Sequence, residues 1–456
     1  MVVGQIANGT EVLVIGGGPG GYHAAATAAR AGKEVVLVEA SLLGGTCLNC
    51  GCIPSKALIQ ATRRASPVSP SGVPPLAEIQ AWKRQVVDRL RRGVEQTLKQ
   101  AGVTLVQGRA TFTGPDRVSV ETAQATEVYR FRHCIIATGS VPAFPPGFAP
   151  DGEGVCDAAA ALEWTEPPEE LVILGAGYIG LELGTAFAKL GSRVTVLEVA
   201  DQILPGLDAE LTRPVARHLE KLGVKVHLGV RATGWEREGG RIVVRAEGVV
   251  PPALPADRVL VATGRLPNIR GLGLEKAGIA LDECGYVRAD DQCRTNVPRI
   301  YAIGDVAGGP LLAHKATREA EVAAAAIAGH VDAMDPAGIP AVIFTEPEVA
   351  TVGLTEAEAR ARGYRVVTGR FPLTASGRAW TLGEPDGFVK VVGDGDTGVL
   401  LGAQMVGPEV SELIAAATLA LELGARVEDV ALTLHPHPTL AEAFMAAAAD
   451  AAAKRR

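Results

Sequence analysis

A βαβ pattern that occurs twice constrains this chain more than any other feature of its sequence. Residues 11–39 (EVLVIGGGPGGYHAAATAARAGKEVVLVE) and 170–198 (ELVILGAGYIGLELGTAFAKLGSRVTVLE) each read as an apolar strand, a G-x-G-x-x-G turn, an Ala- and Leu-rich helix, a second strand and a closing Glu. The first Gly and that Glu are 23 residues apart in both copies, Gly16 to Glu39 and Gly175 to Glu198. The repeat predicts two dinucleotide-binding halves of similar plan.

Each residue type in this pattern has a physical task. The glycines tighten the turn, let the backbone approach a pyrophosphate and let the helix pack on the strand, and the helix N-terminus faces the phosphates. The closing Glu39 and Glu198 are placed to accept hydrogen bonds from ribose hydroxyls, and Glu198 would repel a 2′-phosphate, which favours NAD over NADP. Two such sites on one chain suggest a flavin and a nicotinamide. The glycines are Gly16, Gly18 and Gly21 in the first copy and Gly175, Gly177 and Gly180 in the second.

The rest of the chain is organised around the two copies. Each is followed by a strand that ends in Ala-Thr-Gly, at 134–142 and 260–267. Residues 57–100 have a helical pattern with a Pro-rich loop at 66–75, and 103–131 suggest a small antiparallel sheet. A strand and Gly-rich turn at 299–310 precede an Ala-rich helix to about 329, and residues from about 340 onward lack nucleotide glycines. We therefore expect an α/β protein with two Rossmann-like domains and a C-terminal α+β domain.

Composition excludes several classes of protein. No run of about 18 apolar residues occurs, so we expect no membrane-spanning helix and no membrane partner. The net charge of −7 and the pI near 5.7 argue against nucleic acid as a main partner. The first residues have no basic region and run directly into a strand pattern, which is not typical of a signal peptide. We expect a cytoplasmic protein.

Three cysteines lie within six residues in GGTCLNCGCIPSK, residues 44–56. In a cytosolic chain such a cluster indicates redox catalysis or a metal, and zinc held by all three is the alternative, although no His follows at ligand spacing. In a helix, residues five apart have Cα atoms roughly 8.6 Å apart, too far for a disulfide, so Cys47 is expected in a loop before a helix whose first turn contains Pro54. Cys52 would then lie near the helix N-terminus, where a thiolate is stabilised, with Lys56 one turn later on the same face. The other cysteines are expected to be small buried residues: Cys134, Cys156, Cys284 and Cys293.

A second candidate for chemistry lies in LHPHPTLAEAF, residues 434–444. His437 is followed five residues later by Glu442, so the two can form a base and the carboxylate that orients it. A solvent-exposed His near a helix start is the plainer interpretation. Pro436 and Pro438 make this segment rigid, which suits a positioned base.

With these residues identified, the chain resembles the flavin-dependent pyridine nucleotide-disulfide oxidoreductases, and among them the dihydrolipoamide dehydrogenases. The resemblance runs nearly end to end and depends on GGTCLNCGCIPSK, both glycine fingerprints, the Ala-Thr-Gly segments, YAIGDV, LLAHKATREA, FTEPEVATVGLTE and HPHPTLAEAF. It implies a redox-active Cys47–Cys52 disulfide in which Cys52 faces FAD and Cys47 exchanges with substrate. It further implies that His437 and Glu442 are supplied by the second subunit of a homodimer.

The resemblance also implies binding residues. Lys56 would lie by the flavin with Glu182 as its charge partner, and Asp305 would hold the ribityl chain. The other residues implied at the FAD site, beyond the first glycine turn and Glu39, are Gly45, Thr46, Ala110, Thr138, Gly139, Ser140, Leu311, Leu312, Ala313 and His314. Those implied at the NAD site, beyond the second glycine turn and Glu198, are Glu182, Ala232 and Gly264. No resident metal is expected.

The implied activity is oxidation of the dihydrolipoyl group of an acyltransferase or carrier protein with reduction of NAD, in a 2-oxo-acid dehydrogenase complex. Alternatives are reduction of glutathione, trypanothione or mercuric ion, and a mainly structural role in such a complex. The expected domains are 1–150 (FAD), 151–275 (NAD), 276–338 (central, completing the FAD site) and 339–456 (dimerisation). Position 50 departs from the family pattern, because Cys50 replaces an apolar residue; it is either an inert packing residue or a third thiol that scrambles or protects the disulfide.

Overall fold

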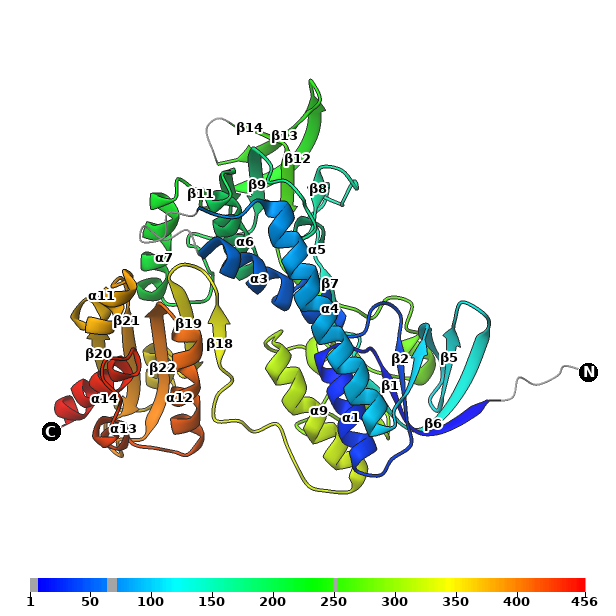
Figure 1. The fold of residues 1–456 in the computed structure, drawn as a ribbon. Helices are drawn as coiled ribbons and strands as arrows, with labels where there is room; N and C mark the ends of the chain where they lie inside the picture. Colours follow the sequence, from blue (N-terminus) through cyan, green and yellow to red (C-terminus); the bar gives the residue numbers. More distant parts are fainter. Residues whose placement is uncertain (1–6, 64–71, 249–251, 456) are drawn as a thin grey trace, which may run out of the picture.

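The computed structural model describes residues 7–63, 72–248 and 252–455. Most of the segment 66–75, expected to be a Pro-rich loop, lies outside these ranges. In the described ranges three large sheets with their helices make up most of the fold, and the chain passes from the first to the second, returns to the first, and ends in the third (Figure 1). No helix in the described ranges combines the length and apolar character that crossing a membrane needs.

The first sheet has seven strands in the order β3-β2-β1-β6-β5-β4, with β17 also paired to β6. Strands β1, β2, β3, β6 and β17 run parallel, whereas β4 and β5 form an antiparallel meander with β6. The bounds are β1 Asn8–Ile15, β2 Val35–Glu39, β3 Thr104–Gln107, β4 Arg109–Gly114, β5 Arg117–Glu121, β6 Thr126–Ile136 and β17 Ile300–Ala302. The small antiparallel sheet expected over 103–131 is confirmed for β4, β5 and β6, whereas β3 pairs parallel with β2 and the long β6 continues alongside β1.

Small side chains pack the helices of this part closely. Helix α1 (Pro19–Arg30) lies against α9 (Ala313–Ala328), and alanines of both are buried, including Ala24, Ala28, Ala320 and Ala323. The long α4 (Leu76–Ala101) runs across α1 and α3 (Cys52–Arg63) (Figure 1). The shorter helices are α2 Gly45–Cys50, α8 Leu274–Ala277 and the 3-10 turn η1 Gly304–Ala307.

The second nucleotide fold is a five-stranded parallel sheet in the order β11-β10-β9-β15-β8. Its strands are β8 Val155–Cys156, β9 Glu170–Leu174, β10 Arg193–Leu197, β11 Lys225–His227 and β15 Arg258–Val261, and its helices are α5 Ala158–Ala161, α6 Tyr178–Lys189 and α7 Ala209–Lys221. A three-stranded antiparallel sheet, β12 Arg231–Glu238, β13 Arg241–Glu247 and β14 Ala253–Ala256, extends from it at the top of Figure 1. A two-stranded ribbon, β7 Ser140–Pro142 with β16 Arg265–Pro267, joins the two folds.

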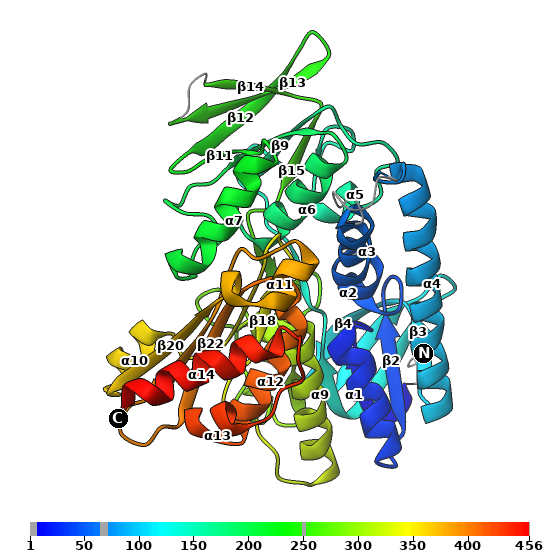
Figure 2. The ribbon, with the colours of Figure 1, turned by 60° about the vertical axis from the view of Figure 1, so that its left-hand side comes forward.

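The C-terminal part is an antiparallel sheet in the order β18-β19-β22-β21-β20 with helices packed on it. Figure 2 shows α12, α13 and α14 in front of these strands. The strands are β18 Ala341–Ile343, β19 Glu348–Gly353, β20 Val366–Pro372, β21 Phe388–Asp394 and β22 Leu400–Gly407. The helices are α10 Glu356–Ala361, the turn η2 Leu373–Ala375, α11 Gly377–Leu382, α12 Val410–Glu422, α13 Val427–Leu432 and α14 Ala441–Arg455. The predicted fold class, an α/β protein with two Rossmann-like domains and a C-terminal α+β domain, is thus confirmed.

Candidate active site

The two glycine turns have the same backbone geometry. Gly16 and Gly175 both have φ +103°, a region that only glycine adopts readily, and a Cβ on Gly21 or Gly180 would collide with the carbonyl oxygen of its first glycine. Helices α1 and α6 then begin directly after Gly18 and Gly177. Both helix N-termini therefore have backbone N–H groups free to face a pyrophosphate.

The closing glutamates brace these turns. Glu39 accepts from the backbone N–H of Gly17 and of Ser41, each at 2.6 Å, and Glu198 accepts from Ala176 at 2.6 Å and from Ala200 at 2.9 Å. Both side chains are buried. Backbone donors thus hold each carboxylate beside its turn, where a ribose would bind.

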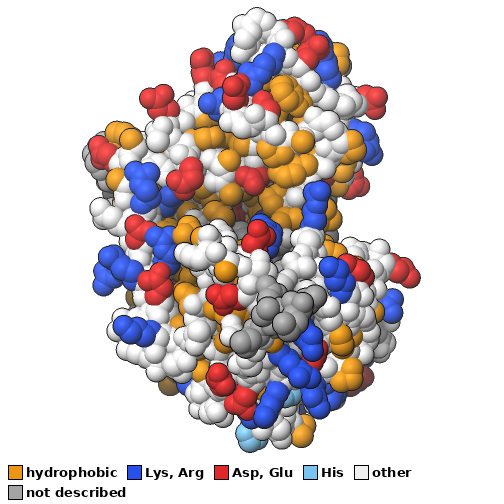
Figure 3. All heavy atoms as spheres, turned by 90° about the vertical axis from the view of Figure 1, so that its right-hand side faces the viewer, with side chains coloured by type: hydrophobic (Ala, Val, Ile, Leu, Met, Phe, Trp, Pro, Cys, Tyr) orange, Lys and Arg blue, Asp and Glu red, His pale blue; other side chains and the backbone are white. Residues whose placement is uncertain are grey.

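A cavity of 820 Å³ lies between the two nucleotide folds. The face drawn in Figure 3 is hollowed between the part that carries β12–β14 and the part that carries β1–β6. The predicted residues that line the cavity are Gly16, Gly18, Glu39, Gly45, Thr46, Cys47, Cys52, Lys56, Ala110, Thr138, Gly139, Ser140, Glu182, Asp305, Leu311 and Ala313. The structure therefore brings together residues that lie far apart along the chain.

Cys47 and Cys52 form a disulfide in this cavity, with their Cα atoms 4.6 Å apart. The zinc alternative needs all three cysteines as free thiols, but two of them are joined to each other in this disulfide. The prediction that Cys47 lies in a loop was wrong, because it belongs to the short helix α2. The chain departs from helical geometry at Gly51 (φ −138°, ψ −107°) and a new helix begins at Cys52. This break brings the two cysteines closer than one continuous helix would.

An ion pair joins the helix that begins with Cys52 to the other nucleotide fold. Lys56 Nζ on α3 donates to Glu182 Oε2 on α6 at 2.8 Å, and Glu182 Oε1 accepts from the backbone N–H of Phe344 at 2.8 Å. The ammonium also lies 4.6 Å from the centre of the Phe344 ring. The carboxylate is almost fully buried, so it fixes α3, α6 and the start of the C-terminal sheet relative to one another.

Arg265 is a cavity residue that the sequence interpretation missed. Its guanidinium donates to Ser140 Oγ at 2.7 Å and to Ser140 O at 2.8 Å, and Ser140 Oγ donates to Asp305 Oδ2 at 2.5 Å. Arg265 directly follows the second Ala-Thr-Gly, and Ser140 directly follows the first. The signal was therefore in the sequence, but the contact depends on the pairing of β16 with β7.

The cavity fits a flavin dinucleotide. Thr138 Oγ1 is buried without a hydrogen-bond partner among the described residues, so it is free for a ligand. Gly18 and Gly45 lie so close that a Cβ on Gly45 would stand 2.6 Å from Gly18 Cα. Because neither residue has a side chain, a ligand can approach the backbone of both closely. Together with Asp305, which also lines the cavity, these groups match the phosphates and hydroxyls of such a ligand.

Other predicted binding residues do not line this cavity. Gly21 packs behind the first turn, Leu312 precedes α9, and His314 Nε2 contacts Pro340 O at 2.7 Å. Of the residues expected to hold NAD, Glu182 alone lines the cavity. Gly175, Gly177, Gly180 and Glu198 lie together at the second turn, Gly264 precedes β16 and Ala232 is in β12.

The predicted base pair forms, but away from the disulfide. His437 Nδ1 lies 2.9 Å from Glu442 Oε1, and Glu442 Oε2 accepts from the backbone N–H of Thr439 at 2.9 Å. The Thr439 N–H and then His437 hold the pKa of Glu442 below its usual value. The His437 side chain is 79% exposed, and neither residue lines the cavity.

The remaining cysteines differ in burial. Cys134, Cys156 and Cys293 are buried, as expected, and burial raises the pKa of Cys156 and of Cys293 to about 12. The expectation was wrong for Cys284, which is exposed because Asp282 folds the chain into a surface turn by accepting from the Cys284 and Tyr286 N–H groups. Cys50 is half-buried and lines the cavity.

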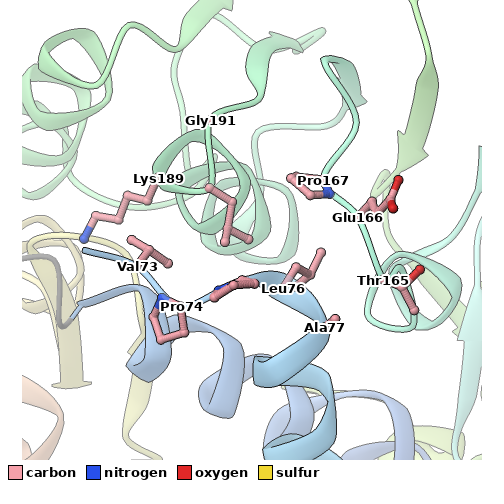
Figure 4. Close-up of a pocket in the computed structure, with 11 residues that line it drawn as sticks. Val73, Pro74, Leu76, Ala77, Thr165, Glu166, Pro167, Lys189 and Gly191 are labelled. Carbon is pink, nitrogen blue, oxygen red and sulfur yellow. The ribbon is translucent and has the colours of Figure 1, made fainter. Parts of the chain in front are cut away.

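A second pocket, of 620 Å³, lies where the segment before α4 meets the end of α6 (Figure 4). Its lining is mostly Pro, Val, Leu and Gly, with Lys189 on one side and Glu166 on the other. It shares no lining residue with the larger cavity. We therefore place the candidate site at the cavity that contains the disulfide.

Proteins of known name are similar to this chain over nearly its whole length. Dihydrolipoyl dehydrogenase 2 of Haloarcula marismortui is 49% identical, covering 99% of this chain and 98% of its own. Dihydrolipoyl dehydrogenase of Geobacillus stearothermophilus is 46% identical, covering 98% and 97%. The solved structure of LpdA from Mycobacterium tuberculosis superimposes with a TM-score of 0.90 at 29% identity, covering 96% of this chain and 99% of that one.

A further solved structure of similar fold is RclA of Escherichia coli, a HOCl-induced flavoprotein disulfide reductase, with a TM-score of 0.89 at 28% identity over 97% of this chain and 99% of that one. Residues 10–320 match the pyridine nucleotide-disulphide oxidoreductase family, and residues 339–448 match its dimerisation domain. With a disulfide between two nucleotide folds and a match over most of its length, the chain belongs to the pyridine nucleotide-disulphide oxidoreductase family.

Proposed function

We propose that this protein oxidises dihydrolipoamide, free or protein-bound, to lipoamide and reduces NAD+ to NADH, using FAD and the Cys47–Cys52 disulfide. The observation that carries the proposal is the position of this disulfide, in a cavity lined by both nucleotide folds. The relatives named dihydrolipoyl dehydrogenase, 46–49% identical, support the choice of substrate.

The chain's own groups perform the thiol chemistry. Because Nδ1 of His437 is engaged by Glu442, Nε2 is free to take a proton from a dihydrolipoyl thiol. The resulting thiolate attacks Cys47 Sγ, so a mixed disulfide forms and the Cys47–Cys52 bond breaks, leaving Cys52 as a thiolate. The second substrate thiol then displaces Cys47, which leaves protonated as lipoamide is released. The residues that line the cavity would hold FAD, which would supply the two-electron redox chemistry that links the thiol pair to NAD+.

We propose the following roles for predicted binding residues. Lys56 with Glu182, and Ser140 with Asp305, would hold the flavin, and the second turn with Glu198 would hold NAD. Gly264 and Ala232 are proposed NAD contacts, and Leu311 to His314 proposed flavin contacts. We keep the division into FAD (1–150), NAD (151–275), central (276–338) and dimerisation (339–456) domains as part of this proposal.

A homodimer follows from the separation of the base from the disulfide. Four leucines of the C-terminal part are exposed in the single chain: Leu419 (61%), Leu423 (73%), Leu432 (81%) and Leu434 (96%). An apolar surface of this kind is typical of an interface. Burying it against a second copy would carry the adjacent His437 toward the partner's disulfide. We further propose a cytoplasmic protein bound to a 2-oxo-acid dehydrogenase complex.

The first experiment is NAD+ reduction by the purified flavoprotein with dihydrolipoamide as donor. We expect fast turnover, much slower turnover with NADP+, and little reduction of oxidised glutathione by either reduced coenzyme. No turnover in protein that holds FAD and an intact disulfide would contradict the proposal and favour another disulfide substrate or a structural role.

A further inference from the structure

Cys50 is a free thiol beside the disulfide, and the proposed mechanism does not use it. It is the last residue of α2, it is half-buried, and it lines the same cavity as Cys47 and Cys52. The cavity thus contains three sulfur atoms, of which two are joined.

Two cysteines, Cys52 and Cys50, lie at similar Cα distances from Cys47. Cys52 lies 4.6 Å away between Cα atoms, across the break at Gly51. Cys50 is three residues along the same helix, where Cα atoms stand about 5 Å apart. Both separations fall in the range of about 4.4–6.8 Å that disulfides span. Cβ atoms three residues apart in a helix are about 5–6 Å from each other. A Cys47–Cys50 disulfide therefore needs the two Cβ atoms to approach by about 1–2 Å. The six-residue helix α2, which ends just before Gly51, can provide this shift.

We propose that Cys50 is a third redox thiol, which exchanges with Cys52 as the partner of Cys47 and gives the oxidised protein a second disulfide state, Cys47–Cys50. The thiolate of Cys50 attacks Cys47 Sγ, the Cys47–Cys50 bond forms, the Cys47–Cys52 bond breaks, and Cys52 leaves as a thiolate. The proton of Cys50 goes to solvent. The exchange is an isomerisation and needs no oxidant or reductant.

The charges around α2 slow the exchange at neutral pH, because only the thiolate of Cys50 can attack Cys47. Burial raises the pKa of Cys50, Asp157 at the start of α5 and Glu163 raise it further, and Arg265 opposes them. From α3, Lys56 is engaged by Glu182, and from α4, Arg91 donates to Asn49 at 3.3 Å. Few Cys50 thiols are therefore ionised at neutral pH.

Raising the pH favours the second state. The exchange releases a proton when Cys52 remains ionised, and Cys52 begins the twelve-residue helix α3, whose N-terminus stabilises a thiolate. Mass action then moves the equilibrium toward Cys47–Cys50 as protons are removed. This inference rests on the proposed function only in taking Cys47–Cys52 as the exchange-active pair.

The test identifies the one free cysteine of residues 47–52 in the oxidised flavoprotein. Protein held at a series of pH values without reductant is quenched in acid and labelled with a maleimide in denaturant, and tandem mass spectrometry locates the label. We expect the label on Cys50 at neutral pH and a shift of most of it to Cys52 in alkali. Label that stays on Cys50 throughout, or that moves to Cys47 and so marks a Cys50–Cys52 bond, would overturn the inference.

Two variants and a control make the result specific. Cys50→Ser should show no label on Cys47 or Cys52 at any pH, and Cys284→Ser should behave like the parent. Asp157→Asn keeps a side chain that caps α5 while removing a charge near Cys50, so the shift after a pH jump should be several-fold faster. Cys52 labelled in Cys50→Ser, or an unchanged rate in Asp157→Asn, would contradict the exchange.

The labelling uses neither NAD nor dihydrolipoamide, so it is independent of turnover. Protein that labels as expected but does not turn over dihydrolipoamide would keep this inference and refute the proposed function. Protein that turns over dihydrolipoamide but is never labelled at Cys52 would refute this inference and keep the proposed function.

Discussion

Lys56 and Glu182 form an ion pair that joins the two nucleotide folds, with Nζ and Oε2 2.8 Å apart. Lys56 comes from the helix that begins with the disulfide, and Glu182 from the helix that follows the second glycine turn. Since Glu182 also accepts from Phe344 N–H, one carboxylate ties together three parts of the chain.

Replacing Glu182 with Ala should destabilise the protein strongly. The change leaves the half-buried ammonium of Lys56 and the Phe344 N–H without their partner, and breaking a buried pair on one side costs about 3–5 kcal/mol. We expect a loss of that size in the free energy of unfolding in urea. Glu238→Ala, which removes an exposed partner of Arg245, should cost less than about 1 kcal/mol. Equal losses in the two variants would show that the Glu182 carboxylate is not a structural tie.

Replacing Arg265 with Met should weaken FAD binding. Without the guanidinium, Ser140 loses two donors and its contact with Asp305 is no longer fixed. A hydrogen bond to a charged group contributes about 1.5–3 kcal/mol, so the Kd for FAD should rise about 10-fold or more. Release of flavin fluorescence on dilution measures this. Arg258→Met, on the exposed side of β15, is the control, and unchanged FAD affinity in Arg265→Met would refute the role of the network.

The sequence predicted the parts of the site whose geometry is local. The spacing from Gly16 to Glu39 and from Gly175 to Glu198 specifies a βαβ unit, and the structure contains both. The partnership of Lys56 with Glu182, although distant in sequence, followed from resemblance and is confirmed.

What could not be predicted depends on single residues that break a helix or organise a turn, and on contacts between segments. The helix that contains Cys47 is stopped by one residue, Gly51, and nothing in the local pattern distinguishes this break from a loop. Arg265 reaches Ser140 only because β16 and β7 pair. Cys284 is exposed because Asp282 organises a turn, which a general preference of Cys for burial cannot anticipate.

The folded protein should become less stable in acid, because Glu346 becomes protonated. Burial opposes its ionisation, but contact with His218, 3.4 Å away, and the ion pair with Lys189 more than compensate and lower its pKa from 4.5 to about 2. Because the folded pKa lies below the unfolded one, the ionised carboxylate stabilises the protein above pH 4.5. This stabilisation is lost as the pH falls from 4.5 to about 2.

The Glu346→Gln variant measures that contribution. We expect its free energy of unfolding to be about 3 kcal/mol lower than the parent's at neutral pH, with the difference shrinking below pH 4.5 and vanishing near 2. Urea unfolding at several pH values provides the comparison, and Glu283→Gln, on an exposed turn, is the control. A difference that does not change with pH would mean that Glu346 acts through packing and not through its charge.

Replacing His437 with Gln should abolish most dihydrolipoamide turnover. The variant cannot take a proton from the substrate thiol, and general base catalysis typically contributes about 10²–10⁴-fold to the rate. Glu442→Gln should cause a smaller loss, because an amide can still orient the ring while losing the charge that stabilises its protonated form. Steady-state NAD+ reduction measures both effects.

Two controls separate this role from damage to the protein. His435→Gln changes the neighbouring half-buried histidine, whose Nδ1 lies 2.8 Å from Thr433 O, and should keep most activity. Opening of the Cys47–Cys52 disulfide by NADH, followed as the appearance of titratable thiols, should be unchanged in His437→Gln because this half of the reaction does not involve the substrate thiol. Normal turnover in His437→Gln would remove His437 from the mechanism. Loss of both half-reactions would instead point to a general defect of the dimer.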